Sequence, residues 1–378
     1  MSRQPTLKTL HPAPAPGTLA LVLALALASL SLVASTSTTP AIAAGSNALR
    51  DACFAPADLA ARPDEKSPRK GLRGFDRAEP ARTLAAFAPV PPHLRGAIRR
   101  VRLSDGQKLV ALTLDLCEQP GEIAGYDGAI IDYLRKEGVK ATLFVGGKWL
   151  RSHETRTRQL MSDPLFEIAN HSAAHRNLRL LSGTHLGEEI EAPQRAYEAV
   201  REGFAREQCV AAAGEAAWRG VPKRMSLFRF PYGACNAASL DAVNNAGLLA
   251  IQWDVSLGDP WPGQSAAAIA REMLSKTKPG SILIGHANGR GFHTAEALPM
   301  VIPKLKAQGY RFVTVSELLA AGTPEVVSTC YNLKPGDTDR YDNLVTALAR
   351  NAKPRATGTG AGANPAKPGG GWAPTVKR

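Results

Sequence analysis

The sequence predicts an α/β protein, a distorted (β/α) barrel of about seven parallel strands over residues 101–322. Strand-like and helical segments alternate there with short links, which is typical of a parallel sheet covered by helices. Polar, ionisable residues gather directly after several of the strand-like segments, where parallel α/β folds carry their chemistry. Six or more such units indicate a barrel that is closed or nearly closed.

Local patterns define each element in turn. Runs rich in Val, Ile and Leu predict buried strands, and apolar residues at helical spacing predict helices. The predicted strands are 108–116, 140–147, one ending near 170, 225–233 with its turn, 248–255, 281–286 and 310–315. The predicted helices are 126–138, 184–204, 239–247, 265–280 and 294–309. Gly138 is a favoured helix stop, Ser265 is a favoured N-cap, and Pro193 is expected to kink its helix.

The first residues predict export. A positive start, an apolar run at 18–35 and the small residues Ala41 and Ala43 are typical of a signal peptide, expected over 1–44. An uncleaved anchor is the alternative, but the run is short for a membrane span and is broken by Ser29 and Ser31. We therefore expect a secreted or periplasmic protein with no stable membrane span after cleavage.

Two extensions flank the predicted barrel. Residues 45–100 form an N-terminal extension rich in Pro and Arg, and 323–378 form a C-terminal one, disordered from about 351. The net charge of +13 favours an acidic partner. Export argues against nucleic acid and for an anionic cell-wall polymer. We expect a monomer, although the sequence does not determine the oligomeric state.

The cysteine count is compatible with disulfides in an oxidising compartment. The five cysteines are Cys53, Cys117, Cys209, Cys235 and Cys330, and an odd number leaves at least one thiol unpaired. A Cys53–Cys330 bridge would join the two extensions, but the sequence leaves the pairing open.

Six motifs occur in order along the barrel segment, and together they resemble one family. They are "TLDLCE", "NHSAAH", "RFPYG", "WDVSLGDPW", "ILIGH" and "GYRFVTVSELL". This set is similar to the polysaccharide deacetylases of carbohydrate esterase family 4, the nodulation-deacetylase homology domain. The resemblance implies a metal-dependent hydrolase of carbon–nitrogen, but not peptide, bonds. Such an enzyme removes N-acetyl groups from an envelope or extracellular polysaccharide, either peptidoglycan or a chitin-like polymer.

The resemblance also assigns catalytic roles. Asp115 matches the general base, and Arg229 matches the residue that pairs with it and keeps it ionised. The backbone N–H of Tyr232 resembles the oxyanion donor. His286 resembles the general acid, and Asp259 the carboxylate that orients it. For Arg229 and Asp259 the alternative is an ordinary surface ion pair.

The predicted metal site contains one departure from the family. His171 and His175 resemble its histidine ligands to a divalent ion, expected to be Zn²⁺; the alternative is two exposed loop histidines. The family's third ligand is an Asp, and Leu116 stands in its place. Glu118 shares the strand parity of Leu116, so we predict it as the third ligand. Cys117, on the side of Asp115, and water are the alternatives.

Two other functions are compatible with the sequence. A non-catalytic glycan-binding protein is favoured by Leu116 and opposed by the retained acid and base. An amidase acting on a non-sugar substrate would fit the same fold. The fourth motif also departs from the family, because Asp259 is followed by Pro260 before Trp261.

Overall fold

The computed structural model describes residues 47–76 and 82–343, all within one compact unit, Ala44–Arg378. The predicted signal peptide and the predicted disordered tail lie outside the described residues. Within the described ranges, no helix is both long and apolar enough to cross a bilayer.

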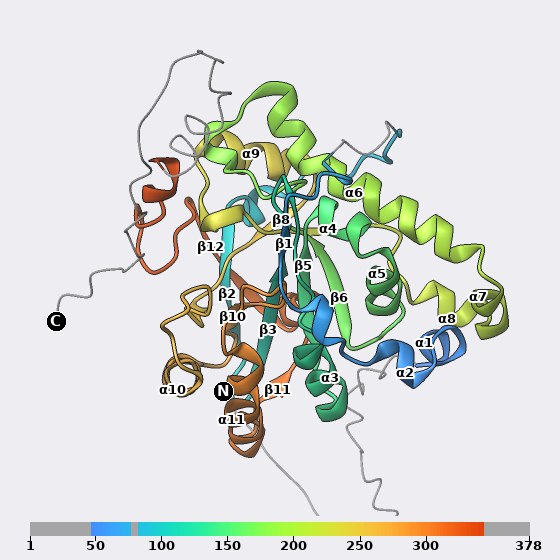
Figure 1. Ribbon diagram of the computed structural model, residues 1–378. Coiled ribbons are helices and arrows are strands. Elements are labelled where there is room, and N and C mark those ends of the chain that lie inside the picture. The colour runs from blue at the N-terminus through green and yellow to red at the C-terminus, as the bar shows by residue number, and fades with distance from the viewer. Residues whose placement is uncertain (1–46, 77–81, 344–378) are drawn as a thin grey trace, which may run out of the picture. The chain divides into compact units, whose positions relative to one another are not determined.

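Helices and strands alternate through most of this unit (Figure 1). The strands are β1 Arg69–Lys70, β2 Ala97–Leu103, β3 Leu109–Leu116, β4 Glu122–Ile123, β5 Ala141–Val145, β6 Phe166–Asn170, β7 Leu227–Phe228, β8 Leu249–Ile251, β9 Val255–Ser256, β10 Ile282–His286, β11 Arg311–Phe312 and β12 Gly322–Val327. The α-helices are α1 Ala48–Cys53, α2 Pro56–Leu59, α3 Gly128–Glu137, α4 Gly147–Ser152, α5 Glu154–Met161, α6 Gly183–Ala205, α7 Gln208–Ala213, α8 Glu215–Arg219, α9 Ala237–Asn245, α10 Ala266–Lys276, α11 Thr294–Ala307 and α12 Val315–Ala320. Four 3₁₀ turns are η1 Pro63–Glu65, η2 Pro92–Leu94, η3 Leu178–Leu180 and η4 Pro231–Gly233.

The main sheet has the order β12-β2-β8-β7-β6-β5-β3-β10-β9, and β11 pairs with β3. Every neighbouring pair from β2 to β9 is parallel, whereas β12 runs antiparallel to β2. A bridge between Arg100 of β2 and Ser281, next to β10, brings the sheet back on itself. The prediction of a distorted, nearly closed (β/α) barrel is confirmed. The sequence did not predict β2 or β12 of this sheet, nor the separate two-stranded sheet of β1 and β4.

The strand β3 separates two packing layers. All eight of its residues are buried. Its even-numbered side chains, including Leu114 and Leu116, belong to the large apolar cluster shared with α3, α6, α10 and α11. Leu109 and Ala111 instead belong to the cluster inside the curved sheet. Odd-numbered positions of β3 therefore face the barrel interior, and even-numbered positions face the helices.

Two disulfides fix the extensions to the barrel segment. Cys53, at the end of α1, bonds Cys209 of α7. Cys235 bonds Cys330, which follows β12. This pairing differs from the Cys53–Cys330 bridge considered from the sequence, and it leaves Cys117 as a buried free thiol.

Candidate active site

The predicted catalytic residues come from five strand ends that the parallel sheet places at one edge. Asp115 lies near the end of β3, and His286 is the last residue of β10. The two residues are opposite each other in the register of these neighbouring strands. His171 follows β6, Arg229 follows β7, and Asp259 follows β9 in the chain.

Asp115 and Arg229 form a buried ion pair. The Arg229 Nη1 atom lies 2.9 Å from Asp115 Oδ1 and also donates to Thr113 Oγ1 at 2.8 Å. The guanidinium stacks over the Phe144 ring at 3.9 Å and is fully buried. Burial alone would raise the pKa of Asp115. The effects of His171 and Arg229 lower it by more than burial raises it, so the pKa lies below its ordinary value. The surface ion pair considered for Arg229 is therefore excluded.

A strained turn positions the two histidines. Ser172 and His175 both have positive φ, 66° and 54°, which is uncommon for residues other than glycine. The Asn170 Oδ1 atom accepts a hydrogen bond from the Ser172 N–H at 2.9 Å, and Ser172 Oγ accepts one from the His175 N–H at 3.1 Å. These bonds offset the cost of the turn and bring the two rings to a 5.0 Å centroid separation.

The histidines have the features of metal ligands. His171 Nδ1 lies 2.9 Å from the Arg229 carbonyl oxygen, which only accepts, so the proton is on Nδ1 and the lone pair on Nε2. Both His171 Nε2 and His175 Nδ1 are buried without a hydrogen-bond partner. Such unpaired buried atoms are costly in a protein interior, and a metal ion would satisfy them.

Cys117 completes this donor set. One ligand atom each from Cys117, His171 and His175 lies within 4.8 Å of the others. The Asn288 amide donates to both the Cys117 carbonyl oxygen and Sγ, at 2.8 and 3.1 Å, and fixes the thiol. Burial raises the pKa of the Cys117 thiol to about 12. Two imidazoles and one sulfur are a donor set that suits zinc.

The structure corrects the predicted role of Glu118. Its carboxylate accepts hydrogen bonds from the Ala124 N–H at 3.0 Å and Ser152 Oγ at 2.6 Å. Lys148 Nζ lies 3.6 Å away on the same side. Glu118 does share the parity of Leu116, but that side of the chain faces the helices. The third donor close to the histidines is therefore Cys117, not Glu118.

His286 and Asp259 form the acid side of the site. His286 Nδ1 donates to Asp259 Oδ1 at 3.0 Å, and the His286 N–H donates to Oδ2 at 2.7 Å. The Thr294 hydroxyl also donates to Oδ2 at 2.7 Å, so Asp259 is buried and firmly held. Burial lowers the pKa of His286, but the Asp259 charge outweighs it and raises the net value. Asp259 is thus not a surface ion-pair residue.

Tyr232 lies next to His175. It occupies η4 with a left-handed backbone, φ 61° and ψ 3°. Its ring meets the His175 ring edge-on at a centroid distance of 4.6 Å. Strain of this kind in a non-glycine residue is often found at functional sites.

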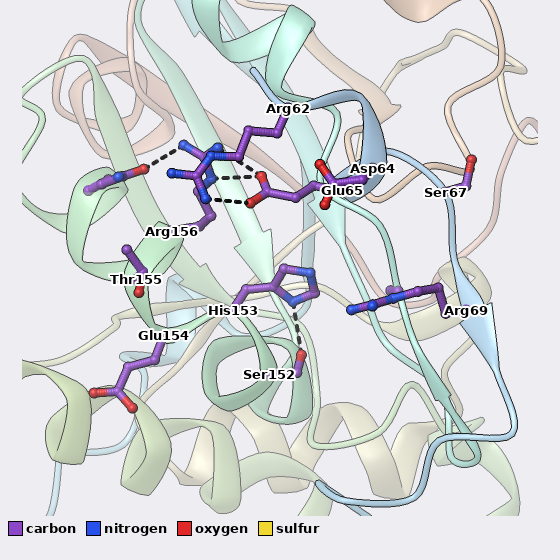
Figure 2. A pocket seen from close by; sticks show the side chains of 12 residues that line it. Arg62, Asp64, Glu65, Ser67, Arg69, Ser152, His153, Glu154, Thr155 and Arg156 are labelled. Atoms are coloured by element: carbon purple, nitrogen blue, oxygen red, sulfur yellow. Dashed lines mark hydrogen bonds and ion pairs between the residues drawn. The ribbon is translucent and has the colours of Figure 1, made fainter. Parts of the chain in front are cut away.

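A separate polar cavity of about 240 Å³ lies behind this site, on the helix-facing side of the β3–α3 loop. Its lining includes Ser152 and His153, whose side chains are 2.9 Å apart, and Arg156, which pairs with Glu65 (Figure 2). None of the candidate catalytic or metal-binding residues lines it. Glu118 separates the two places, because its carboxylate contacts Ser152 while Cys117 beside it faces the histidines.

Sequence reasoning missed two residues that support the site. Thr113 holds the Arg229 guanidinium, and Asn288 holds Cys117. Thr113 lies two positions before Asp115, so strand parity would have placed both on the same face. Asn288 lies two positions after His286, in the loop between β10 and α11, where no motif marks it.

Comparisons with known proteins point to one family of enzymes. Residues 102–251 match the family model for polysaccharide deacetylase. A peptidoglycan-N-acetylglucosamine deacetylase of Bacillus cereus is 28% identical over 218 residues, 57% of this chain and 90% of its own. A chitooligosaccharide deacetylase of Azorhizobium caulinodans is 27% identical over 222 residues, 55% of this chain and 93% of its own. Among solved structures, a family 4 pseudoenzyme from Bacillus anthracis has 25% identity and a TM-score of 0.48, covering 60% of this chain and 69% of its own.

Residues 102–251 therefore form a polysaccharide deacetylase domain within this chain. The family predicted from its ordered motifs is confirmed, and so is the enzyme class, a polysaccharide deacetylase.

Proposed function

We propose that this protein is an exported, metal-dependent hydrolase that removes N-acetyl groups from glucosamine units of an envelope polysaccharide, peptidoglycan or a chitin-like polymer. The observation that carries the proposal is the convergence of Cys117, His171 and His175 beside the Asp115–Arg229 ion pair, with no hydrogen bond to His171 Nε2 or His175 Nδ1. A glycan-binding surface alone has no use for such a donor set.

The metal ligands in this proposal are His171, His175 and Cys117, and the ion is divalent, with zinc the best match. When bound, zinc supplies Lewis-acid activation of the acetamide carbonyl and of water. The Arg229 carbonyl fixes the tautomer of His171, and Asn288 orients the sulfur of Cys117.

The remaining steps belong to side chains of this chain. Asp115, held ionised by Arg229, takes a proton from the attacking water. The Tyr232 N–H stabilises the oxyanion that forms on the former carbonyl oxygen. His286 then protonates the departing sugar amine, since its raised pKa keeps a proton available and Nδ1 is already committed to Asp259. Asp259 and Arg229 act by positioning and charge.

Substrate class and location rest on separate observations. The two curated relatives are named for action on peptidoglycan and on chitooligosaccharide, both polymers with N-acetylglucosamine. Disulfides persist in oxidising compartments, so Cys53–Cys209 and Cys235–Cys330 support export. A net charge of +13 would favour an anionic cell-wall polymer.

Metal analysis coupled to acetate release tests this proposal. The purified protein should contain about one zinc per chain and release acetate from peptidoglycan or chitooligosaccharides. The Cys117→Ser variant should lose most of the zinc. After cobalt substitution, wild type should show an intense sulfur-to-cobalt charge-transfer band that Cys117→Ser lacks. Full zinc content and an unchanged cobalt spectrum in Cys117→Ser would remove Cys117 from the ligand set.

A second candidate, a non-catalytic glycan-binding protein, is favoured by one observation. Leu116 stands at the position of the family's carboxylate ligand, and it is buried among apolar side chains. Under this alternative the protein binds chitooligosaccharides, yet releases no acetate even when loaded with zinc.

A further inference from the structure

The segment 328–343, here called the C-terminal strap, follows β12 and lies outside the residues matched by the family model. Its start is fixed to the barrel. Cys330 bonds Cys235, three residues after Tyr232 in the chain. Arg99 stacks over the Tyr331 ring at 3.7 Å, and Trp253 Nε1 donates to Asn332 Oδ1 at 3.0 Å.

The far end of the strap is held by the loop that follows His175. Arg179 pairs with Asp339 at 2.6 Å and with Asp342 at 3.1 Å. Asn177 Nδ2 donates to Asp342 Oδ1 at 2.8 Å. The strap is therefore attached to the two loops that carry His175 and Tyr232, and both attachments flank one residue, Tyr341.

Tyr341 ends a row of aromatic rings that starts at the metal site. The His175 and Tyr232 ring centroids are 4.6 Å apart, and those of Tyr232 and Tyr341 are 5.2 Å apart with a 30° tilt. Tyr341 is half-buried, so part of its ring remains accessible. The exposed Arg340 side chain lies 5.0 Å from the ring centroid and donates to the Tyr341 hydroxyl at 3.2 Å.

We propose that Tyr341 forms a sugar-binding subsite at the rim of the active site, where it packs against a pyranose ring next to the unit that loses its acetyl group. The faces of a pyranose ring present C–H groups, and the negative face of an aromatic ring attracts them. This inference rests on the proposed function for the site beside it, and it adds a contact that the matched domain alone does not supply.

A purely structural role for Tyr341 makes a different prediction. If the ring only supports Tyr232, its loss disturbs the oxyanion side and lowers turnover for every substrate. A subsite instead matters only for substrates long enough to reach it. Substrate length therefore separates the two roles.

The experiment compares chitobiose and chitopentaose with the full-length protein, measuring acetate release and equilibrium binding by calorimetry. For chitopentaose, Tyr341→Ala should raise KM and the dissociation constant roughly fivefold, about 1 kcal/mol, with kcat unchanged. For chitobiose both values should stay within about twofold of wild type. Tyr341→Phe keeps the ring and should match wild type. Leu333→Ala, at an exposed position of the same strap, is the matched control.

Equal losses on both substrates, or no loss on either, would overturn the subsite. The binding measurement keeps this test independent of the proposed function. If wild type binds chitopentaose without releasing acetate, the catalytic proposal fails, while the ratio of binding constants still decides the role of Tyr341. If wild type does not bind chitopentaose more tightly than chitobiose, the subsite is absent.

Discussion

The two sides of the chain at the end of β3 carry similar residues and have different roles. On the interior side, Asp115 and Cys117 meet His171 and His175. On the helix side, Glu118 meets Ser152 and Lys148. Each side thus has a buried carboxylate close to nitrogen-bearing side chains, and adjacent residues of one strand end supply both.

The difference lies in how the side chains are grouped. On the helix side, Glu118 Oε2 accepts hydrogen bonds from a backbone N–H and a hydroxyl, and Oε1 lies 3.6 Å from the Lys148 ammonium. These contacts hold the β3–α3 loop against α4. On the interior side, one ligand atom each from Cys117, His171 and His175 lies within 4.8 Å of the others, and His171 Nε2 and His175 Nδ1 have no hydrogen-bond partner. The convergence of three donor atoms that suit a metal ion, rather than the presence of a buried carboxylate, identifies the active side.

The largest effect should come from removing the general base from the interior side, which tests whether that side is catalytic. Asp115→Asn preserves size and hydrogen-bonding capacity but cannot accept the proton of water. We expect kcat/KM for acetate release to fall about 10³-fold, within the range for a lost general base. Zinc content should stay at the wild-type value, because Asp115 is not among the ligands. A variant that loses activity and zinc together would place Asp115 in the metal site instead.

The residues that the sequence predicted for the interior side do lie together, because motif order and strand-end position are local features. The sequence did not predict Cys117 as the third ligand, and the reason is physical. All residues of β3 are buried, as is common in parallel sheets, so its sequence lacks the alternation of polar and apolar residues that would reveal the inner face. Parity correctly grouped Glu118 with Leu116 and Cys117 with Asp115. Only the packing of Leu116 against the helices shows which pair points inward.

Leu116→Asp tests the helix-facing placement directly. The new carboxylate would enter an apolar cluster, and we expect the free energy of unfolding to fall by about 3 kcal/mol or more. Urea denaturation followed by circular dichroism measures this change, with Leu116→Met as a volume-conserving control. A Leu116→Asp protein that is as stable as wild type and binds zinc more tightly would mean that position 116 faces the metal after all.

The acid side of the site gives a prediction in pH. Asp259 raises the pKa of His286, so the proton of the general acid persists to higher pH than in an isolated imidazole. Asp259→Asn removes the charge and should lower this pKa. The alkaline limb of the kcat/KM profile should then move to lower pH, because the imidazolium loses the negative charge that stabilises it. An alkaline limb that does not move would show that another group limits the rate there.

Features that depend on contacts between distant segments could not be predicted from the sequence. The cysteine pairing was left open, because sequence spacing does not show that α1 packs on α7 or that the strap returns to η4. Tyr341 was overlooked for the same reason. It lies in a segment with no motif, and its position beside Tyr232 arises only after the strap folds back.

The smallest expected effect is the sharpest test of the comparison. Glu118→Gln keeps the size of the side chain and an oxygen that accepts from the Ala124 N–H and Ser152. It loses the charge opposite Lys148, at 3.6 Å. Burial is the main reason that the pKa of Glu118 is raised, so removing this charge also removes a desolvation cost. The two effects oppose each other, and we expect the free energy of unfolding to change by about 1 kcal/mol or less.

Zinc content and acetate release of Glu118→Gln should equal those of wild type, measured beside Cys117→Ser in the same preparations. The sequence alone predicts the reverse, a loss of both in Glu118→Gln. Because Glu118 and Cys117 are neighbours in the chain, a disturbance of the loop would affect the two variants alike. The two variants will differ in zinc content only if the Glu118 and Cys117 side chains point to opposite sides of the chain. If Glu118→Gln folds normally but loses its zinc, Glu118 returns to the ligand set and the assignment of the two sides is reversed.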